Sequence, residues 1–159
     1  MTDCSNCAGI ADADAGRHPW AIAQLEAGHV WLNPAQYYEG ATFYVAKSCV
    51  AELHELGPHE RSVHLMEMAG VAAAVFDEFG ARKMNYEALG NSVAHLHWWL
   101  TPRHHDDPRP RGPIWEDLDF LRMLWSQQSV PERDLADDLR RRVLGALRRH
   151  SLVLEATFI

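Results

Sequence analysis

The stretch His95-Leu96-His97-Trp98-Trp99-Leu100 constrains the fold more than any other part of the chain. Successive side chains of a β-strand point to opposite faces, so alternate residues of this stretch share a face. One face carries His95, His97 and Trp99, and the other carries Leu96, Trp98 and Leu100. The pattern predicts a strand that buries one face and presents two imidazoles on the other. Two imidazoles this close are able to share a metal, a phosphate or a proton, although short His-x-His pairs also occur in strands that have no such task.

The order of the other elements predicts an α+β domain with a mostly antiparallel sheet. Strands are expected at 29–33, 41–46 and 84–89, where β-branched and aromatic residues are bounded by turn signals. A long amphipathic helix is expected from residue 60 to about 79, with apolar residues at spacings of three and four. A short helix is expected at 116–125. The capping box at 129–132 predicts a second long helix that ends near residue 150.

Composition indicates one ordinary folded domain, which we place at 1–159. The chain has 159 residues, of which 47% are hydrophobic and 23% charged, so it is long enough for a sizeable core without disulfides. A net charge of −7 argues against a protein that coats nucleic acid, because phosphate binding needs clustered Lys and Arg. We find no apolar run of the ~20 residues that a membrane span needs. The polar start of the sequence lacks a signal-peptide pattern, which favours the cytoplasm and reduced thiols.

Several motifs around the histidine stretch resemble the histidine triad (HIT) family, whose motif is His-x-His-x-His-x-x. The matching segments, in chain order, are Tyr44 to Val50, Gly57-Pro58-His59-Glu60, Gly90-Asn91-Ser92-Val93 and Pro102-Arg103. The resemblance covers roughly residues 4–107, and the order of motifs agrees throughout. It implies a HIT-like fold, with an antiparallel sheet of about five strands and a long helix after the second main strand. Residues 108–159 would form a loop and a helical C-terminal extension.

The resemblance also implies a reaction, nucleotidyl transfer or hydrolysis at the α-phosphorus of a nucleoside phosphate. His97 matches the middle histidine and would be the nucleophile, forming a covalent nucleotidyl-histidine. Ser92 and Asn91 would donate hydrogen bonds near the bridging oxygen. Asn85 would contact phosphate, and Asn33 would hold the ribose hydroxyls. Neutral imidazole suits the nucleophilic role near pH 7, provided that one nitrogen is free and the other donates its hydrogen to an acceptor.

Trp99 departs from the family pattern, because it stands where the third histidine is expected. An indole donates one N–H at most and carries no charge, so it cannot support the transition state as a histidine does. Trp99 would instead stack on the substrate or wall off the site, and Arg103 is a further candidate for phosphate. Two alternatives stay open: a nucleotide-binding protein that has lost turnover, and a zinc-stabilised interaction module without a nucleotide site.

The three cysteines fall on positions that the resemblance assigns to structural zinc. Some family members bind zinc through an N-terminal Cys-x-x-Cys, the His of a Lys-x-His segment and the first triad histidine. Here those positions hold Cys4, Cys7, Cys49 and His95, a normal Cys3His set for zinc. His54 is the reserve ligand. The alternative is that Cys49 is a small buried hydrophobe and that the N-terminal Cys-x-x-Cys is disordered.

The resemblance implies a homodimer, with a small nucleotide as the binding partner and no nucleic acid or membrane. Three other histidines, His59, His64 and His150, are expected on helix surfaces. The arginines at 140–142 and 148–149 follow several aspartates along one helix, an arrangement that suits the helix dipole and needs no ligand.

Overall fold

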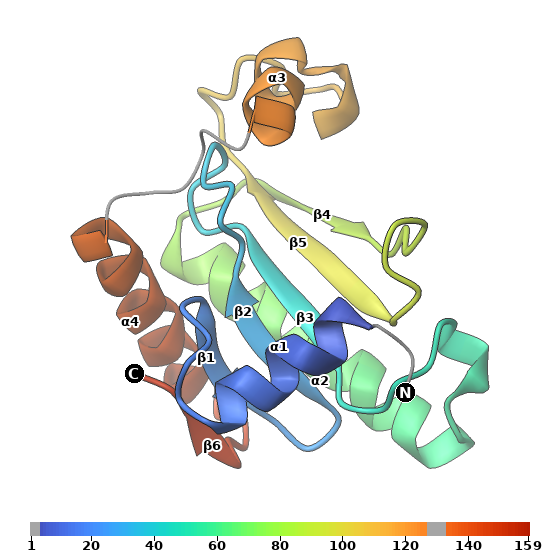
Figure 1. Cartoon of the computed structure of the whole chain (residues 1–159). Coiled ribbons are helices and arrows are strands. Elements are labelled where there is room, and N and C mark those ends of the chain that lie inside the picture. Colours follow the sequence, from blue (N-terminus) through green and yellow to red (C-terminus); the bar gives the residue numbers. More distant parts are fainter. Residues whose placement is uncertain (1–3, 127–132) are drawn as a thin grey trace.

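The computed structural model describes residues 4–126 and 133–159, which form an antiparallel sheet with helices on both faces (Figure 1). The sheet has six strands in the order β4-β5-β3-β2-β1-β6, and every pairing between them is antiparallel. The strands are β1 (Ala21–Gln24), β2 (Gly28–Leu32), β3 (Thr42–Ala46), β4 (Lys83–Glu87), β5 (His97–Arg103) and β6 (Ala156–Thr157). This confirms the α+β class and the antiparallel sheet. The short strands β1 and β6 were not predicted from the sequence.

The helices agree with the expected ones and add one at the start of the chain. They are α1 (Ser5–Asp14), α2 (Pro58–Glu78), α3 (Leu118–Ser126) and α4 (Arg133–Arg149), with short 3-10 turns η1 (Leu53–Glu55) and η2 (Ile114–Glu116). Helix α2 begins at the Gly57-Pro58 signal, as predicted. The capping box expected at 129–132 lies outside the described residues. No described helix is long and apolar enough to cross a membrane.

The two faces of the sheet are covered by different helices (Figure 1). Strand β2 shows why: Val30 and Leu32 join the main core with α2 and α4, whereas Trp31 packs against α1 on the opposite face. The strand is buried along its whole length, and apart from the buried His29 its residues are apolar on both sides. Helix α1 therefore lies over the face of the sheet to which His97 belongs.

Strand β5 differs from its predicted span. It begins at His97 rather than His95, and it continues through Pro102 to Arg103 instead of stopping at the proline. Beyond Leu100 the strand pairs with β4 alone, because β3 ends opposite Leu100. Proline lacks an N–H and is tolerated where one side of a strand has no partner.

His64 corrects another expectation, because it is fully buried rather than on the surface of α2. Its Nε2 accepts a hydrogen bond of 3.0 Å from the indole N–H of Trp98, and its Nδ1 lies 3.4 Å from the carbonyl oxygen of Ala27. Burial is the main cause that lowers the pKa of His64, which keeps the ring neutral. Trp98 is thus bound into the core face of β5, and the opposite face is left for the site.

Candidate functional site

His95, just before β5, and His97, its first residue, use their ring nitrogens in opposite ways. The Nε2 of His95 lies 2.8 Å from the carbonyl oxygen of Ala46, and the Nδ1 of His97 lies 2.7 Å from the carbonyl oxygen of His95. A carbonyl only accepts hydrogen bonds, so the ring hydrogen is on Nε2 in His95 and on Nδ1 in His97. His95 therefore has a free lone pair on Nδ1, and His97 has one on Nε2.

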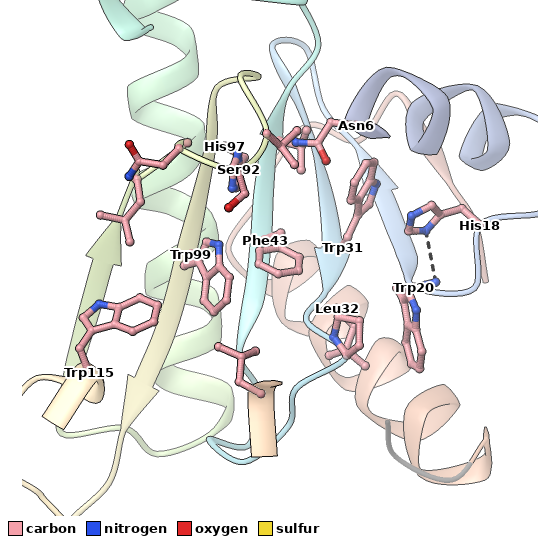
Figure 2. A pocket seen from close by; sticks show the side chains of 17 residues that line it. Asn6, His18, Trp20, Trp31, Leu32, Phe43, Ser92, His97, Trp99 and Trp115 are labelled. Carbon is pink, nitrogen blue, oxygen red and sulfur yellow. Dashed lines mark hydrogen bonds between the residues drawn. The ribbon is translucent and has the colours of Figure 1, made fainter. Parts of the chain in front are cut away.

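His97 lines a cavity of about 530 Å³ on the face of the sheet next to α1 (Figure 2). Most of the lining is aromatic or aliphatic, and polar groups are few. Asn91 and Ser92, the two residues that the resemblance assigns as hydrogen-bond donors, line the cavity together with His97. Gly90 has a φ of +63°, a left-handed value that glycine adopts without strain, and it turns the chain after β4 into the loop that carries them.

Asn6 also reaches this cavity, from the first turn of α1 (Figure 2). Asn6 lies between Cys4 and Cys7, so contacts that fix the two cysteines also fix the position of the Asn6 side-chain amide in the cavity. Sequence reasoning missed Asn6, because nothing in the motif indicates which way the two residues between the cysteines point.

Aromatic side chains flank His97 on two sides (Figure 2). On the side of β1 and α1, Trp31 packs against His18, with ring centroids 4.4 Å apart, and Trp20 lies next to them. On the side of β4, Trp99 packs against Trp115, with centroids 5.9 Å apart. Phe43 lies between the two groups, with its ring centroid 6.4 Å from His97 and 5.2 Å from Trp99. The cavity therefore offers flat apolar surfaces in both directions from the imidazole.

The four residues proposed as metal ligands come together as expected. The ligand atoms of Cys4, Cys7, Cys49 and His95 all lie within 4.8 Å of one another. The Nδ1 of His95 is 3.3 Å from the Sγ of Cys4 and 3.5 Å from the Sγ of Cys7. Tetrahedral zinc with ordinary Zn–S and Zn–N bond lengths would separate such atoms by about 3.5 Å. The contact of Nε2 with a backbone carbonyl directs the His95 lone pair at the thiols, which is the usual arrangement behind a zinc-bound histidine.

The thiols of this cluster affect one another's ionisation. Burial raises the pKa of Cys4, but the N–H of Cys7 and the contacts with Cys7 and His95 outweigh it and lower the pKa to about 7. Contact with the Cys49 thiol, followed by burial and Cys4, raises the pKa of Cys7 to about 12. Neighbouring thiolates repel one another, and a bound cation is what allows all three to ionise together. The donor set therefore fits a divalent cation that prefers sulfur and nitrogen. His54 is exposed and is not part of the cluster.

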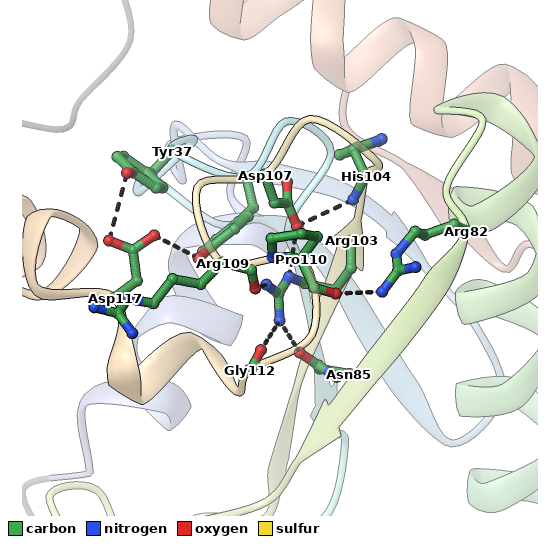
Figure 3. A network of polar contacts seen from close by, with 11 residues as sticks. Tyr37, Arg82, Asn85, Arg103, His104, Asp107, Arg109, Pro110, Gly112 and Asp117 are labelled. Atoms are coloured by element: carbon green, nitrogen blue, oxygen red, sulfur yellow. Dashed lines mark hydrogen bonds and ion pairs between the residues drawn. The ribbon is translucent and has the colours of Figure 1, made fainter.

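Arg103 lies on the same face of β5 as His97 but outside the cavity, in a polar network with the following loop (Figure 3). Its Nε donates to Asp107 at 2.7 Å, and its other nitrogens donate to the carbonyl oxygens of Arg109 and Gly112. The guanidinium also lies over the ring of Tyr38, 4.9 Å from its centroid. With 3% of its side chain exposed and four hydrogen bonds to protein groups, Arg103 is buried away from the cavity and anchors residues 104–112.

The two asparagines assigned by resemblance also lie outside the cavity lining. The Oδ1 of Asn85 accepts a hydrogen bond of 3.0 Å from Arg103, so Asn85 belongs to the polar network of Figure 3. Asn33 is buried, and its Oδ1 accepts from the N–H of Ala35 in the turn around Pro34. The structure therefore brings together His97, Asn91, Ser92 and Trp99, but it does not place Asn33, Asn85 or Arg103 among them.

Trp115 is the residue of the site that sequence reasoning missed most completely. It belongs to η2, in the segment after the motif-bearing part, and it lines the cavity next to Trp99. Its indole N–H donates to Glu87 of β4 at 2.9 Å. A tryptophan in a proline-rich segment carries no periodic signal, so only the folded chain shows where it goes.

Comparison with solved structures finds several histidine triad proteins. A histidine triad protein from Marinobacter aquaeolei VT8 is 24% identical with a TM-score of 0.67, over 81% of this chain and 88% of that one. One from Sinorhizobium meliloti 1021 is 23% identical with a TM-score of 0.67, over 79% and 89%. A zinc-bound histidine triad family protein from Mycobacterium smegmatis is 18% identical with a TM-score of 0.63, over 92% and 94%. Neither a family model nor a curated protein matches the sequence. The chain thus has the histidine triad fold.

Proposed function

We propose that this protein binds a nucleoside phosphate in the cavity beside α1 and transfers or hydrolyses its nucleotidyl group through His97. The observation that carries the proposal is the state of that imidazole. Its Nδ1 hydrogen is held by the carbonyl oxygen of His95, so the lone pair on Nε2 is free, and the ring lines a cavity of about 530 Å³. Pockets of this size and apolar lining are typical of small-ligand sites.

We propose the following covalent step for this site. The Nε2 lone pair of His97 attacks the α-phosphorus, an N–P bond forms, and the bond from phosphorus to the leaving group breaks. The leaving group departs with the electron pair and takes up a proton from solvent. Water then attacks the same phosphorus, the N–P bond breaks, and its electron pair returns to Nε2 while the water proton is released. The Nδ1 hydrogen stays on the ring and remains hydrogen-bonded to the carbonyl oxygen of His95. This contact stabilises the positive charge on the ring while phosphorus is bound.

Asn91 and Ser92 are the polar donors that support this reaction. Both line the cavity with His97 and come from the loop that connects β4 with β5. Fixed donors near a departing oxygen stabilise charge that develops in the transition state. Since the cavity has few other polar side chains, we assign the phosphate end of the substrate to this loop.

We also propose that Cys4, Cys7, Cys49 and His95 hold a structural zinc ion. The support is the donor set and its spacing, given above, together with the tautomer of His95. Bound zinc would supply positive charge for three thiolates and a link between the start of α1, the segment after β3 and the start of β5. It would not meet the substrate, because His97 alone of the two histidines turns its free nitrogen to the cavity.

The nucleotidyl-histidine is the intermediate to test. The protein is incubated with adenosine 5′-phosphoramidate or a diadenosine polyphosphate, quenched, and digested for mass spectrometry under conditions that preserve the N–P bond. We expect a nucleotidyl group on His97 of the unsubstituted protein. The His97→Asn variant should carry no such group and should show no turnover. The matched control is His105→Asn, an exposed histidine outside the cavity, which should leave both unchanged. Modification of another residue, or turnover by His97→Asn, would contradict the proposal.

The second candidate is a nucleotide-binding protein without turnover. Trp99 favours it, because an indole at this position supplies no charge to the transition state. In that case a nucleotide raises the melting temperature of the protein, but neither product nor modified His97 appears. If no nucleotide changes the melting temperature, a zinc-stabilised interaction module is the better description.

A further inference from the structure

A second cavity lies beside the thiol cluster. Its volume is about 680 Å³, and it is distinct from the cavity that His97 lines. Ser92 and Val93 line both cavities, so the loop before β5 lies between them. Of the four proposed zinc ligands, only Cys4 and Cys49 line the second cavity. A small molecule in this cavity therefore meets two of the three thiols.

The three cysteines differ in how far they are open to solvent. Cys49 is exposed, whereas Cys4 and Cys7 are half-buried. The backbone next to Cys49 is fixed, because the carbonyl oxygen of Val50 accepts a hydrogen bond of 2.7 Å from the N–H of Leu96. Cys49 is therefore held beside the start of β5 and is open to the second cavity.

The charge of the second cavity bears on which molecules enter it. Among the described residues that line it, Glu55 alone is charged, and its carboxylate accepts hydrogen bonds from the N–H groups of Ala51 and Glu52. The other lining residues supply hydroxyls, thiols and small aliphatic side chains. A negative charge without a compensating cation disfavours anions, so the cavity suits a small uncharged molecule.

We infer that Cys49 is an oxidation site for a small uncharged hydroperoxide, and that the product is a disulfide bond between Cys49 and Cys4. The Sγ of Cys49 attacks the terminal peroxide oxygen, an S–O bond forms, and the O–O bond breaks. The second oxygen leaves as an alcohol or, from hydrogen peroxide, as water. The Sγ of Cys4 then attacks the sulfenic sulfur of Cys49, an S–S bond forms, and water leaves. The two sulfurs lose two electrons, which the hydroperoxide gains.

When zinc is bound, this oxidation releases it. A disulfide is no longer a pair of thiolates, so Cys7 and His95 are the two remaining ligands, and two ligands do not complete a tetrahedral zinc site. The two protons that the products need then come from solvent, whereas in the metal-free protein they come from the thiols of Cys4 and Cys49. The oxidation itself needs no metal.

The partner of Cys49 is Cys4 rather than Cys7, because Cys4 lines the same cavity and the ligand atoms of the cluster lie within 4.8 Å of one another. A bond between Cys4 and Cys7 would close within the first turn of α1. A bond between Cys4 and Cys49 instead joins the start of α1 to the segment after β3. The helix therefore stays attached to the sheet after the metal has left, and reduction in the presence of zinc restores the original site.

The disulfide map is the first test. The zinc-loaded protein is treated with hydrogen peroxide, its remaining free thiols are alkylated, and it is digested without reduction for mass spectrometry. We expect Cys4 and Cys49 to be joined, Cys7 to be alkylated, and one zinc ion per chain to be taken up by a chromogenic chelator. Dithiothreitol with added zinc should restore the free thiols and the bound metal. A map in which Cys4 and Cys49 are not joined overturns the inference.

Two variants that keep four zinc ligands show which thiol is attacked. Cys49→His and Cys7→His each leave a Cys2His2 set, which is also a normal zinc site. Cys49→His should release zinc under peroxide at least about tenfold more slowly than the unsubstituted protein, because the thiol that is open to peroxide is gone. Cys7→His should still form the bond between Cys4 and Cys49. Equal rates of zinc release in the two variants overturn the inference.

A variant that binds no zinc is compared in the metal-free state, where the rate at which free thiols disappear under peroxide gives the same comparison. If the unsubstituted protein binds no zinc, the zinc proposal fails, and the disulfide map of the metal-free protein still decides the oxidation site. No step of the oxidation involves His97. Failure of the nucleotidyl reaction therefore leaves the inference standing, and failure of the disulfide map leaves the nucleotidyl reaction standing.

Discussion

His95 and His97 carry their ring hydrogens on opposite nitrogens, although a single residue separates them. The carbonyl oxygen of His95 accepts the Nδ1 hydrogen of His97, so the backbone of the first histidine sets the orientation of the second. The side chain of His95 faces three thiols, and that of His97 faces the cavity. The thiol cluster and the proposed nucleophile are therefore connected through the backbone of His95.

Removal of metal should destabilise the protein and expose its thiols. A strong chelator is expected to release one zinc ion per chain, lower the stability by about 4 kcal/mol and lower the melting temperature by roughly 10 °C. The reason is that the proposed zinc ion would join the start of α1 to the residues just before β5. Metal analysis, thiol titration and calorimetry measure the three effects.

Substitutions at the cluster test its composition. Cys49→His should keep zinc, since Cys2His2 is also a normal set, whereas Cys49→Ala should lose it. His54→Ala serves as the control, because His54 is exposed and outside the cluster. Zinc retained by Cys49→Ala at full stoichiometry would show that the ligand set is different.

Trp99→His restores a titratable donor at the third position of the triad. We expect hydrolysis of adenosine 5′-phosphoramidate to rise by about tenfold or more, because one lost transition-state contact commonly costs 10²-fold or more. Values of kcat/KM measure the effect, with Trp125→Ala, at an exposed position of α3 outside the cavity, as control. A fall in turnover would show that Trp99 is needed for the geometry of the site.

Arg103→Met should unfold the loop that follows β5. The substitution leaves the Asp107 carboxylate, 7% exposed, without its cation, and a buried ion pair that loses one partner commonly costs about 3–5 kcal/mol. It also removes the donors to the carbonyls of Arg109 and Gly112. Urea unfolding measures the loss of stability. Arg111→Met, at an exposed position of the same loop, should change it by less than about 0.5 kcal/mol.

The contribution of Asp117, at the start of α3, to the stability of the protein should depend on pH. Burial raises the pKa of Asp117, but hydrogen bonds from the N–H groups of Phe120 and Asp119 and from Tyr38 outweigh it and lower the pKa. The carboxylate therefore adds stability above its unfolded pKa of about 3.9, and this contribution is lost as the pH falls through the lowered folded value. Asp117→Ala should cost about 1–3 kcal/mol at pH 7.

The difference between Asp117→Ala and the unsubstituted protein should be constant from about pH 5 to pH 7 and should shrink below about pH 4. Urea unfolding at several pH values measures it. Asp119→Ala is the control, since the Asp119 side chain is 75% exposed and pairs with Arg122 at the surface. A difference that does not change between pH 7 and pH 3 would mean that the charge of Asp117 contributes nothing.

Local patterns in the sequence were enough to predict the elements that bury one regular face. The alternation from His95 to Leu100 predicted which residues of β5 share a face, and the spacing of apolar residues predicted α2. Short elements without such a pattern, β1 and β6, were missed, because four or two residues give too few repeats to distinguish a strand from a loop. His64 was misplaced because a polar residue on an amphipathic helix was assumed to face water, whereas Trp98 gives it a partner in the core.

The sequence by itself determined which residue types are present for the proposed chemistry: an imidazole for attack on phosphorus, and three thiols with a histidine suited to zinc. Their roles were expected from the resemblance to the histidine triad family and not from local spacing, because Cys4 and His95 are 91 residues apart and only folding brings them together. The tertiary structure alone decided that Arg103 anchors a loop and that Trp115 meets Trp99. Contacts across an irregular, proline-rich segment depend on packing and on hydrogen bonds between distant groups, and no periodicity in the chain records them.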